Sequence, residues 1–578
     1  MKKQLLGSAI VAVVIGAANA AELPLKAPPP PPAPAWSWAG FFIGGHVGGM
    51  FGTASFDNPF GPSIFGDRVR TPGFLGGAQI GYNFQAPSSP WVFGLEGDVS
   101  GLASDGTNTC LAFSALFVSA NCHVRPRATG TFTGRIGYAL GPEGHTLVYG
   151  KGGGAWLNEN VDITTNGDLT IMGLPFPVTS ANQTSWGWTA GAGVEQALTP
   201  AWSLRLEYDY LQFGSFGVAT PPGAALVGRR FFETPPTTTH VTQNVQQVKL
   251  GVNYKFNADP WARWDAQPAG PASYPVKAPF YNAPAASWLS GWEFELGARY
   301  VYGFGRFQKD LAPPSLVSRL TYADMRTNAG EFFGRVDTPL NIMVKGLIGV
   351  GSGRSGHMND EDWALGGALL AYSNTLADPV HDRINYGLID VGYDVLRTGD
   401  YKIAPFVGYT QFNSDMSAFG CTPIAAFNCV PAVPATGAPN ITEDDTWQAL
   451  RVGVAGDAML SPQVKLSADV AYLPYAQFSG LDNHFFGNTG ILNRFSPVSG
   501  TGQGVQLEAL LAYYVTPQFS VGIGGRFWSA WTTAGHYSQT IVNPTVDQPT
   551  GSFGPFPARF KSEQSAVFVQ AAYAFGRP

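Results

Sequence analysis

Two short motifs place ionisable side chains at positions i and i+2 of the chain. Asp360 and Asp362 form the first motif, and Asp482 and His484 form the second. In an extended chain this spacing puts both side chains on one face, about 7 Å apart. A carboxylate pair that faces a carboxylate–imidazole pair can activate water against a polar bond. We therefore interpret these four residues as the catalytic set of a hydrolase, on the condition that the fold brings the two motifs together.

Each motif has a simpler interpretation when it is taken alone. An Asp-x-Asp pair in an exposed loop is often a solvated charge patch, and occasionally a calcium site. His357 and His381 are two further histidines near the first motif, and most loop histidines have no chemical role. The catalytic interpretation depends on both motifs lying at the same end of one fold.

The composition predicts a protein of the outer membrane. The chain is 45% hydrophobic, 13% aromatic and only 13% charged, with 72 glycines, whereas ordinary soluble domains carry about 25% charged residues. A β-barrel in a membrane needs an apolar outer wall and few charges. The formal net charge of −6 argues against a nucleic-acid partner.

The N-terminus is typical of an exported protein. Lys2 and Lys3 precede an apolar run over residues 5–17, and residues 18–20 form a small-x-small cleavage site. This pattern predicts a signal peptide over residues 1–20. No later stretch reaches about 18 consecutive apolar residues, so no transmembrane helix is expected. Residues 21–37 are Pro-rich and are expected to be an extended leader without a core.

The four cysteines form two local pairs, Cys110 with Cys122 and Cys421 with Cys429. In an oxidising compartment each pair is expected to close a loop disulfide. Free thiols or metal ligands are the alternatives, but neither pair has further Cys or His at zinc-like spacing. No metal or cofactor is expected.

A similar sequence segment precedes a series of alternating strands at two places in the chain. Residues 25–40 are echoed by residues 276–292, and each copy precedes a series of alternating segments. The pattern predicts an all-β fold of two tandem antiparallel transmembrane barrels. The first has about eight strands over residues 38–256. A Pro-rich linker covers residues 257–287, and the second barrel has about ten strands over residues 288–578. The segment 316–336 is long enough for two strands, so the second count varies by one or two.

Tight turns predict the orientation of the second barrel. They occur near residues 338–341, 398–400, 461–463 and 516–518, and short turns are typical of the periplasmic end. The segments after the third and seventh strands then lie outside the cell. These segments hold the two motifs, so the strand count alone places both motifs at the extracellular rim.

The two halves resemble two different families. Residues 38–45 and the aromatic-ended strand 248–256 resemble the small porin-like outer-membrane immunogenic proteins of alphaproteobacteria. The run 356–363, followed by residues 372–375 and 385–387, resembles the omptin family of outer-membrane proteases. The first resemblance implies a fold and a location but no chemistry.

The omptin resemblance implies a function for the second half. It implies a ten-stranded barrel with a groove at the extracellular end, in which Asp360 and Asp362 face Asp482 and His484. It also implies water-mediated cleavage of an extracellular peptide or protein, and a requirement for lipopolysaccharide. The chain departs from the family at Gly480, where omptins have an acid that binds a basic side chain of the substrate.

Other omptin features have only weak counterparts. A second specificity carboxylate on the first strand is not evident, and Asp310 is the nearest acid. Arg299, Arg306 and Arg335 are candidates for lipopolysaccharide contacts by residue type alone, and ordinary anchors at the membrane interface are the alternative.

Three functional hypotheses remain at this point. The first is an outer-membrane, aspartic-type endopeptidase preceded by a non-catalytic barrel. The second is a surface or structural barrel, or an adhesin, in which the acids have no catalytic role. The third is a single porin of about eighteen strands. The Pro-rich linker and the closing strand in mid-chain argue against the third.

Overall fold

The computed structural model describes most of the chain. The described residues are 36–57, 68–113, 118–141, 143–166, 178–227, 230–256, 291–313, 316–363, 373–425, 435, 437–486, 491–543 and 548–575. The expected signal peptide, most of the expected leader and the Pro-rich linker lie outside these residues. Among the described residues, no helix is long and apolar enough to cross a lipid bilayer.

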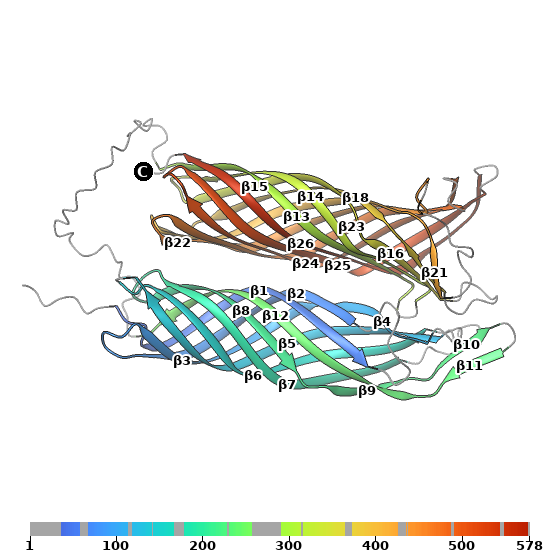
Figure 1. Ribbon diagram of the computed structural model, residues 1–578, viewed down its shortest axis with the longest axis horizontal. Helices are drawn as coiled ribbons and strands as arrows, with labels where there is room; N and C mark the ends of the chain where they lie inside the picture. The colour runs from blue at the N-terminus through green and yellow to red at the C-terminus, as the bar shows by residue number, and fades with distance from the viewer. Residues whose placement is uncertain are drawn as a thin grey trace, which may run out of the picture. The chain divides into compact units, whose positions relative to one another are not determined.

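Eight long antiparallel strands form the first barrel (Figure 1). They are β1 (Gly40–Asp57), β2 (Arg68–Gln85), β3 (Trp91–Ser104), β5 (Val118–Leu140), β6 (Thr146–Asn166), β7 (Val178–Ala197), β8 (Trp202–Phe213) and β12 (Thr237–Lys255). The ring closes because β1 pairs with both β2 and β12. The short strands β4 (Gly106–Phe113), β9 (Phe216–Thr220), β10 (Gly223–Val227) and β11 (Arg230–Thr234) extend one end of the barrel.

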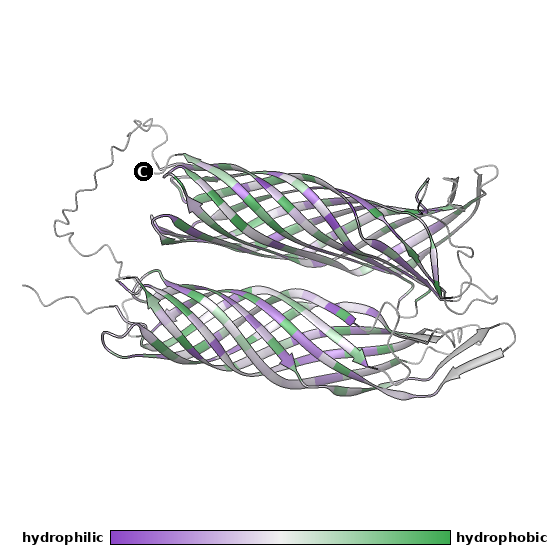
Figure 2. Ribbon diagram, viewed as in Figure 1, coloured by the Kyte–Doolittle hydropathy of each residue, from purple (hydrophilic) through white to green (hydrophobic). Residues whose placement is uncertain are grey.

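Exposed and less exposed side chains alternate along the strands, as in β7, and Figure 2 shows hydrophilic and hydrophobic residues mixed along the strands of both barrels. Phe41, Ile80 and Phe132 project outward and are 60%, 58% and 66% exposed. The lumen of the first barrel contains buried ion pairs: Lys151 Nζ lies 2.8 Å from Glu207 Oε1, and Arg205 Nη1 lies 2.7 Å from Glu96 Oε2. An eight-stranded barrel has an interior just wide enough for side chains to fill, so these pairs occupy the lumen.

Ten long antiparallel strands form the second barrel. They are β13 (Glu293–Leu311), β14 (Ser318–Asp337), β15 (Ile342–Arg354), β18 (Val380–Tyr393), β20 (Tyr401–Ala418), β22 (Ile441–Ser461), β23 (Val464–Phe486), β24 (Ile491–Tyr514), β25 (Phe519–Asn543) and β26 (Gln548–Phe575). β13 pairs with both β14 and β26 and closes the ring. The segment 316–336, which is long enough for two strands, forms one strand, β14.

The fold class is therefore confirmed: the chain is all-β, with two tandem barrels of eight and ten long strands. The hypothesis of a single porin of about eighteen strands is wrong. Each ring closes on its own first strand, since β1 pairs with β12 and β13 pairs with β26. A continuous eighteen-stranded sheet would need those edges to be open.

The second barrel extends beyond the membrane at the end that carries the motifs. A membrane-spanning strand needs about 9–11 residues, whereas β23 has 23 and β26 has 28. On the outer face, Leu450 and Tyr475 are opposite each other and exposed, and the next outward pair along both strands is Gln448 and Gln477. The apolar wall of β22 and β23 ends there, so the outer parts of these strands lie outside the bilayer.

Three short strands continue the wall at this outer end. They are β16 (His357–Asp362), β17 (Ser373–Ala377) and β21 (Thr422–Ala425), while β19 (Leu396–Arg397) belongs to the opposite end. β16 folds back onto the outer half of β14 in antiparallel register. The turns that join β14 to β15 and β22 to β23 lie at the opposite end, which is periplasmic by the short-turn rule.

The disulfide prediction is confirmed for the first pair, because Cys110 and Cys122 are bonded and link β4 to β5. Cys421 also forms a disulfide, and Cys429, its predicted partner, lies outside the described residues.

Candidate active site

Both motifs lie on strands rather than in loops. Asp360 and Asp362 occupy β16, where they are opposite Leu320 and Ser318 of β14. Asp482 and His484 occupy the outer end of β23, which continues beyond the sequence prediction for that strand. The alternation of a strand therefore directs the two side chains of each motif to one face.

The Asp–His pair forms a hydrogen bond whose direction is set by a third residue. His484 Nε2 lies 3.1 Å from Asp482 Oδ2, and Arg494 Nη2 lies 3.2 Å from His484 Nδ1. A guanidinium group can only donate, so Nδ1 accepts from Arg494 and Nε2–H donates to Asp482. Asp482 thus orients the imidazole, as a carboxylate does for a histidine base.

Electrostatic interactions connect the two motifs. Burial raises the pKa of Asp362, whereas its interactions with Arg494 and His484 lower it. Burial and the neighbouring Asp362 together hold the pKa of Asp360 well above its ordinary value. Asp482 also raises the pKa of Asp360. Charges that perturb one another in this way lie within electrostatic range, so the two motifs act on each other at the same end of the second barrel.

The two aspartates of β16 differ in their hydrogen bonding. Asp360 Oδ1 is buried and accepts no hydrogen bond from any residue that the structure describes. Ser373 Oγ donates to Asp362 Oδ2 at 3.5 Å. Two neighbouring acids with raised pKa values can share one proton, and Asp360 is the better candidate to hold it.

A buried lysine lies beneath the Asp–His pair. Lys309 Nζ on β13 lies 2.7 Å from Asp482 Oδ2, and it donates to Glu443 Oε2 at 2.9 Å and to Oε1 at 3.0 Å. Glu443 is opposite Asp482 in the register of β22 and β23. Burial raises the pKa of Glu443 to about 8, against the lowering effect of Lys309. His484 and Lys309 lower the pKa of Asp482, which therefore stays ionised.

Sequence reasoning missed Lys309, Glu443 and Arg494. Lys309 lies on β13, far in sequence from Asp482. Glu443 and Arg494 are the cross-strand partners of Asp482 and His484 on the neighbouring strands β22 and β24, so linking them requires the register of those strands. One feature of the sequence could have indicated these residues. They are charged positions on the inward faces of strand ends, in a chain that otherwise carries few charges. Among the described residues, no group of His, Cys, Asp and Glu side chains is arranged to hold a metal ion.

Three further residues that the sequence analysis considered, His357, His381 and Asp310, make other contacts. His357 Nδ1 is 3.8 Å from Asp324 Oδ2, and the ring of His381 packs on Phe419 at 4.6 Å. Asp310 forms an ion pair with Arg319 at 2.7 Å instead of joining the cluster around Asp482.

Two of the three arginines proposed for lipopolysaccharide contacts point into the lumen, so their prediction was wrong. Arg299 pairs with Glu331 at 2.9 Å, and Arg335 pairs with Asp457 at 2.6 Å. The alternation of β13 and β14 directs both side chains inward. Arg306 is partly exposed and remains a candidate by type.

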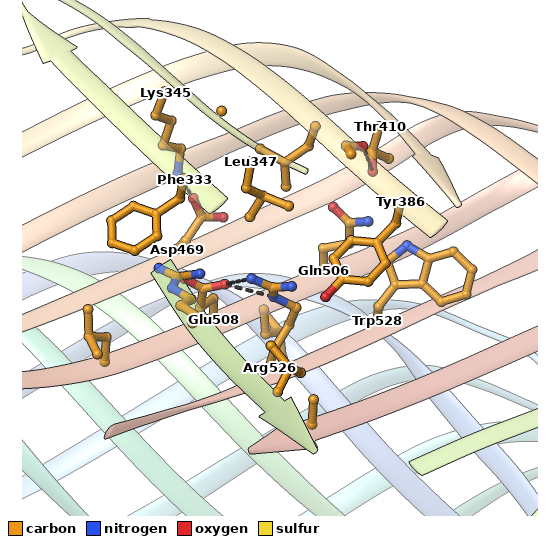
Figure 3. A pocket seen from close by; sticks show the side chains of 18 of the residues that line it. Phe333, Lys345, Leu347, Tyr386, Thr410, Asp469, Gln506, Glu508, Arg526 and Trp528 are labelled. Carbon is orange, nitrogen blue, oxygen red and sulfur yellow. Dashed lines mark hydrogen bonds and ion pairs between the residues drawn. The ribbon is translucent and has the colours of Figure 1, made fainter. Parts of the chain in front are cut away.

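The lumen of the second barrel contains a separate cavity of about 200 Å³ (Figure 3). Arg526 crosses it and pairs with Glu508 at 2.6 Å and with Glu331 at 2.8 Å. Trp528, which lines this cavity, contacts Trp447 with ring centroids 6.5 Å apart. The cavity therefore belongs to a paired lumen network and contains none of the motif residues.

Comparisons with known proteins concern mainly the first barrel. The sequence profile described as "Outer membrane protein beta-barrel domain" matches residues 8–256. The 31 kDa outer-membrane immunogenic protein of Brucella melitensis is 30% identical over 265 residues, which are 44% of this chain and 100% of that protein. The 22 kDa outer membrane protein of Rhizobium leguminosarum is 28% identical over 218 residues, which are 38% of this chain and 80% of that protein.

Solved structures also resemble the chain. The crystal structure of the outer membrane protease OmpT from Escherichia coli aligns with 49% of this chain and 97% of its own, at 13% identity and a TM-score of 0.41. The relative from Brucella melitensis is matched over its whole length. This chain therefore belongs to the family of outer-membrane immunogenic β-barrel proteins, and it is located in the outer membrane.

Proposed function

We propose that the second barrel is an omptin-like endopeptidase, which hydrolyses peptide bonds of extracellular substrates at its outer rim. The observation that carries this proposal is the hydrogen-bonded pair of Asp482 and His484 in electrostatic contact with Asp360 and Asp362. The site lies on the parts of the strands that extend beyond the apolar wall. The first barrel has no catalytic role in this proposal.

His484 is the general base of the proposed reaction. Its Nε2–H is bound to Asp482, so Nδ1 is the nitrogen that accepts a proton from water. The water takes the place of Arg494 at Nδ1 when substrate binds. Asp482 then stabilises the imidazolium that forms, which is the role of the carboxylate in other histidine bases.

The aspartate pair acts on the other side of the scissile bond. Asp360 and Asp362 share one proton, polarise the carbonyl group and help to hold the water. Lys309 is a positioning residue, because it contacts Asp482 and Glu443 but none of the reacting atoms. No covalent intermediate is required, since neither motif contains a Ser, Thr or Cys nucleophile.

Peptide cleavage by the full-length protein tests this proposal. The protein is refolded with and without lipopolysaccharide and incubated with a peptide library. We expect cleavage by the wild type, and a loss of about 10²–10⁴ in kcat for His484→Ala, which is the usual contribution of a general base. His381→Ala is the matched control, because that ring packs on Phe419 away from the motifs. Unchanged cleavage by His484→Ala would remove the residue from the mechanism.

A non-enzymatic surface barrel is the second candidate, and one specific observation favours it. Arg494 covers His484 Nδ1 and Lys309 covers Asp482 Oδ2, so the cluster is a paired ion network as it stands. In that case the wild type cleaves no peptide under any condition. His484→Ala then changes only the free energy of unfolding.

A further inference from the structure

Arg494 lies over the base of the proposed reaction. It is opposite His484 in the register of β23 and β24, and its Nη2 donates to His484 Nδ1 over 3.2 Å. In the proposed reaction Nδ1 must accept a proton from water. The guanidinium group therefore blocks the base until another group draws it away.

A carboxylate is a better partner for this guanidinium group than the imidazole is. Nδ1 of His484 is an uncharged acceptor with one lone pair, because Nε2 carries the proton that binds Asp482. A carboxylate offers a guanidinium group two parallel, charge-assisted hydrogen bonds. A carboxylate that enters the site can therefore take Arg494 away from His484.

No acid of the site holds Arg494. Among the described residues, its side chain forms no ion pair and no hydrogen bond other than the one to His484. Arg494 lowers the pKa of Asp360 and of Asp362, so it lies within electrostatic range of this pair without contacting it. The positive charge of Arg494 is therefore left without a directly bound carboxylate in this part of the structure.

The other cation at the second motif has its acids on the protein. Lys309 Nζ is buried and lies 2.7 Å from Asp482 and 2.9 Å from Glu443. Arg494 is partly exposed, and the side chain of His484 next to it is 16% exposed. Of these two cations, Arg494 is the one with donors left for a ligand.

We propose that Arg494 is a specificity-determining residue, which binds the carboxylate of an aspartate or glutamate side chain of the substrate next to the scissile bond. This inference rests on the proposed endopeptidase function. Gly480 agrees with it, because this position carries no acid that would repel such a side chain. On binding, the guanidinium group moves from His484 to the substrate, and Nδ1 becomes free for water.

The proposal links substrate binding to release of the base. A residue that only binds the substrate changes KM, whereas a residue that also covers the base changes kcat. An acidic peptide should therefore have both a lower KM and a higher kcat than the same peptide with an amide in place of the acid. An arginine that only supports the fold would not discriminate between the two peptides.

Two peptides that differ only in glutamate or glutamine next to the scissile bond test the proposal. Glutamine keeps nearly the shape of glutamate but has no charge. Both peptides are acetylated and amidated at their ends, so that no terminal carboxylate can bind instead. We expect the refolded full-length wild type to cleave the glutamate peptide with a kcat/KM that is at least about 10-fold higher, which corresponds to about 1.4 kcal/mol.

Variants at position 494 assign the preference to the guanidinium group. Arg494→Met keeps the aliphatic stem without a charge or a donor, and should abolish the preference for glutamate. Arg494→Lys keeps the charge but not the paired donors, and should retain only part of the preference. Arg383→Met is the matched control, because Arg383 is exposed on the outer face of β18, and it should keep the wild-type ratio.

The outcomes separate the inference from the proposed function. Equal cleavage of both peptides by the wild type, or a glutamate preference that survives in Arg494→Met, overturns the inference and leaves the proposed function intact. If Arg494→Met does not fold, the ratio in Arg494→Lys decides, and an unchanged ratio there overturns the inference. If the wild type cleaves no peptide, the proposed function fails and the inference fails with it.

Discussion

Replacing Glu443 with glutamine should flatten the pH dependence of stability. In the folded protein the pKa of Glu443 is raised from 4.5 to about 8, and burial is the largest cause. The folded state therefore holds this proton more tightly than the unfolded state. Because unfolding releases the proton between these two pH values, stability is highest below about pH 4.5 and falls as the pH rises toward 8.

The size of this effect follows from the two pKa values. They differ by about 3.5, and each unit corresponds to about 1.36 kcal/mol, so the contribution across the window approaches about 5 kcal/mol. Glutamine has no ionisable proton but keeps an oxygen that can accept from Lys309. Glu443→Gln should therefore lose this part of the decline while its stability at pH 4.5 stays close to that of the wild type.

Urea unfolding followed by tryptophan fluorescence measures the effect. Trp447 lies four residues from Glu443 on β22, and its indole is a probe near the cluster. The free energy of unfolding is measured from pH 4.5 to pH 8.5 in lipopolysaccharide-containing micelles. Asp400→Asn is the control, since Asp400 is exposed at the opposite end of the barrel. Equal declines in the wild type and in Glu443→Gln would refute the assignment of a neutral, buried Glu443.

Three further predictions concern charge, cross-linking and permeability. Arg494→Gln removes a charge that lowers the pKa of both Asp360 and Asp362; the alkaline limb of the kcat/KM profile, which reports loss of the shared proton, should move to higher pH. Reducing the disulfide between Cys110 and Cys122 opens the short loop that it closes. The free energy of unfolding, measured by urea titration, should fall by about 2–3 kcal/mol. Planar-bilayer recordings should show no stable large conductance, because ion pairs cross the lumens of both barrels. Steady porin-like channels would contradict that assignment.

Much of the fold could be predicted from local patterns. A strand that is apolar on one face and polar on the other has a period of two, and a short turn fixes which strands are neighbours. The alternating pattern over residues 316–336 allows one strand or two, because periodicity does not reveal where a strand crosses the bilayer. The structure assigns it as one strand, whose outer part pairs with β16 instead of β15.

The candidate site was predictable only as two separate motifs. Strand counting predicts both motifs at the same rim, and the structure has both at one end of the second barrel, on β16 and β23. Lys309 could not be predicted, because its contact with Asp482 joins strands that are distant in sequence. Glu443 and Arg494 lie on strands next to the motif, but β-bulges shift the registers of these strands, so counting residues from the turns does not pair them. The inward direction of Arg299 and Arg335 was also missed, since their residue type suits either face of a barrel.

The sequence by itself determined which faces of the strands are apolar, that the strands form two rings, and that both motifs lie at one end, because these depend on local alternation and connection length. The tertiary structure decided which charges lie together. Closing a ring sets the register between strands that are distant in sequence. The closed ring places the ammonium of Lys309 on β13 under Asp482 on β23, and no local rule specifies this contact.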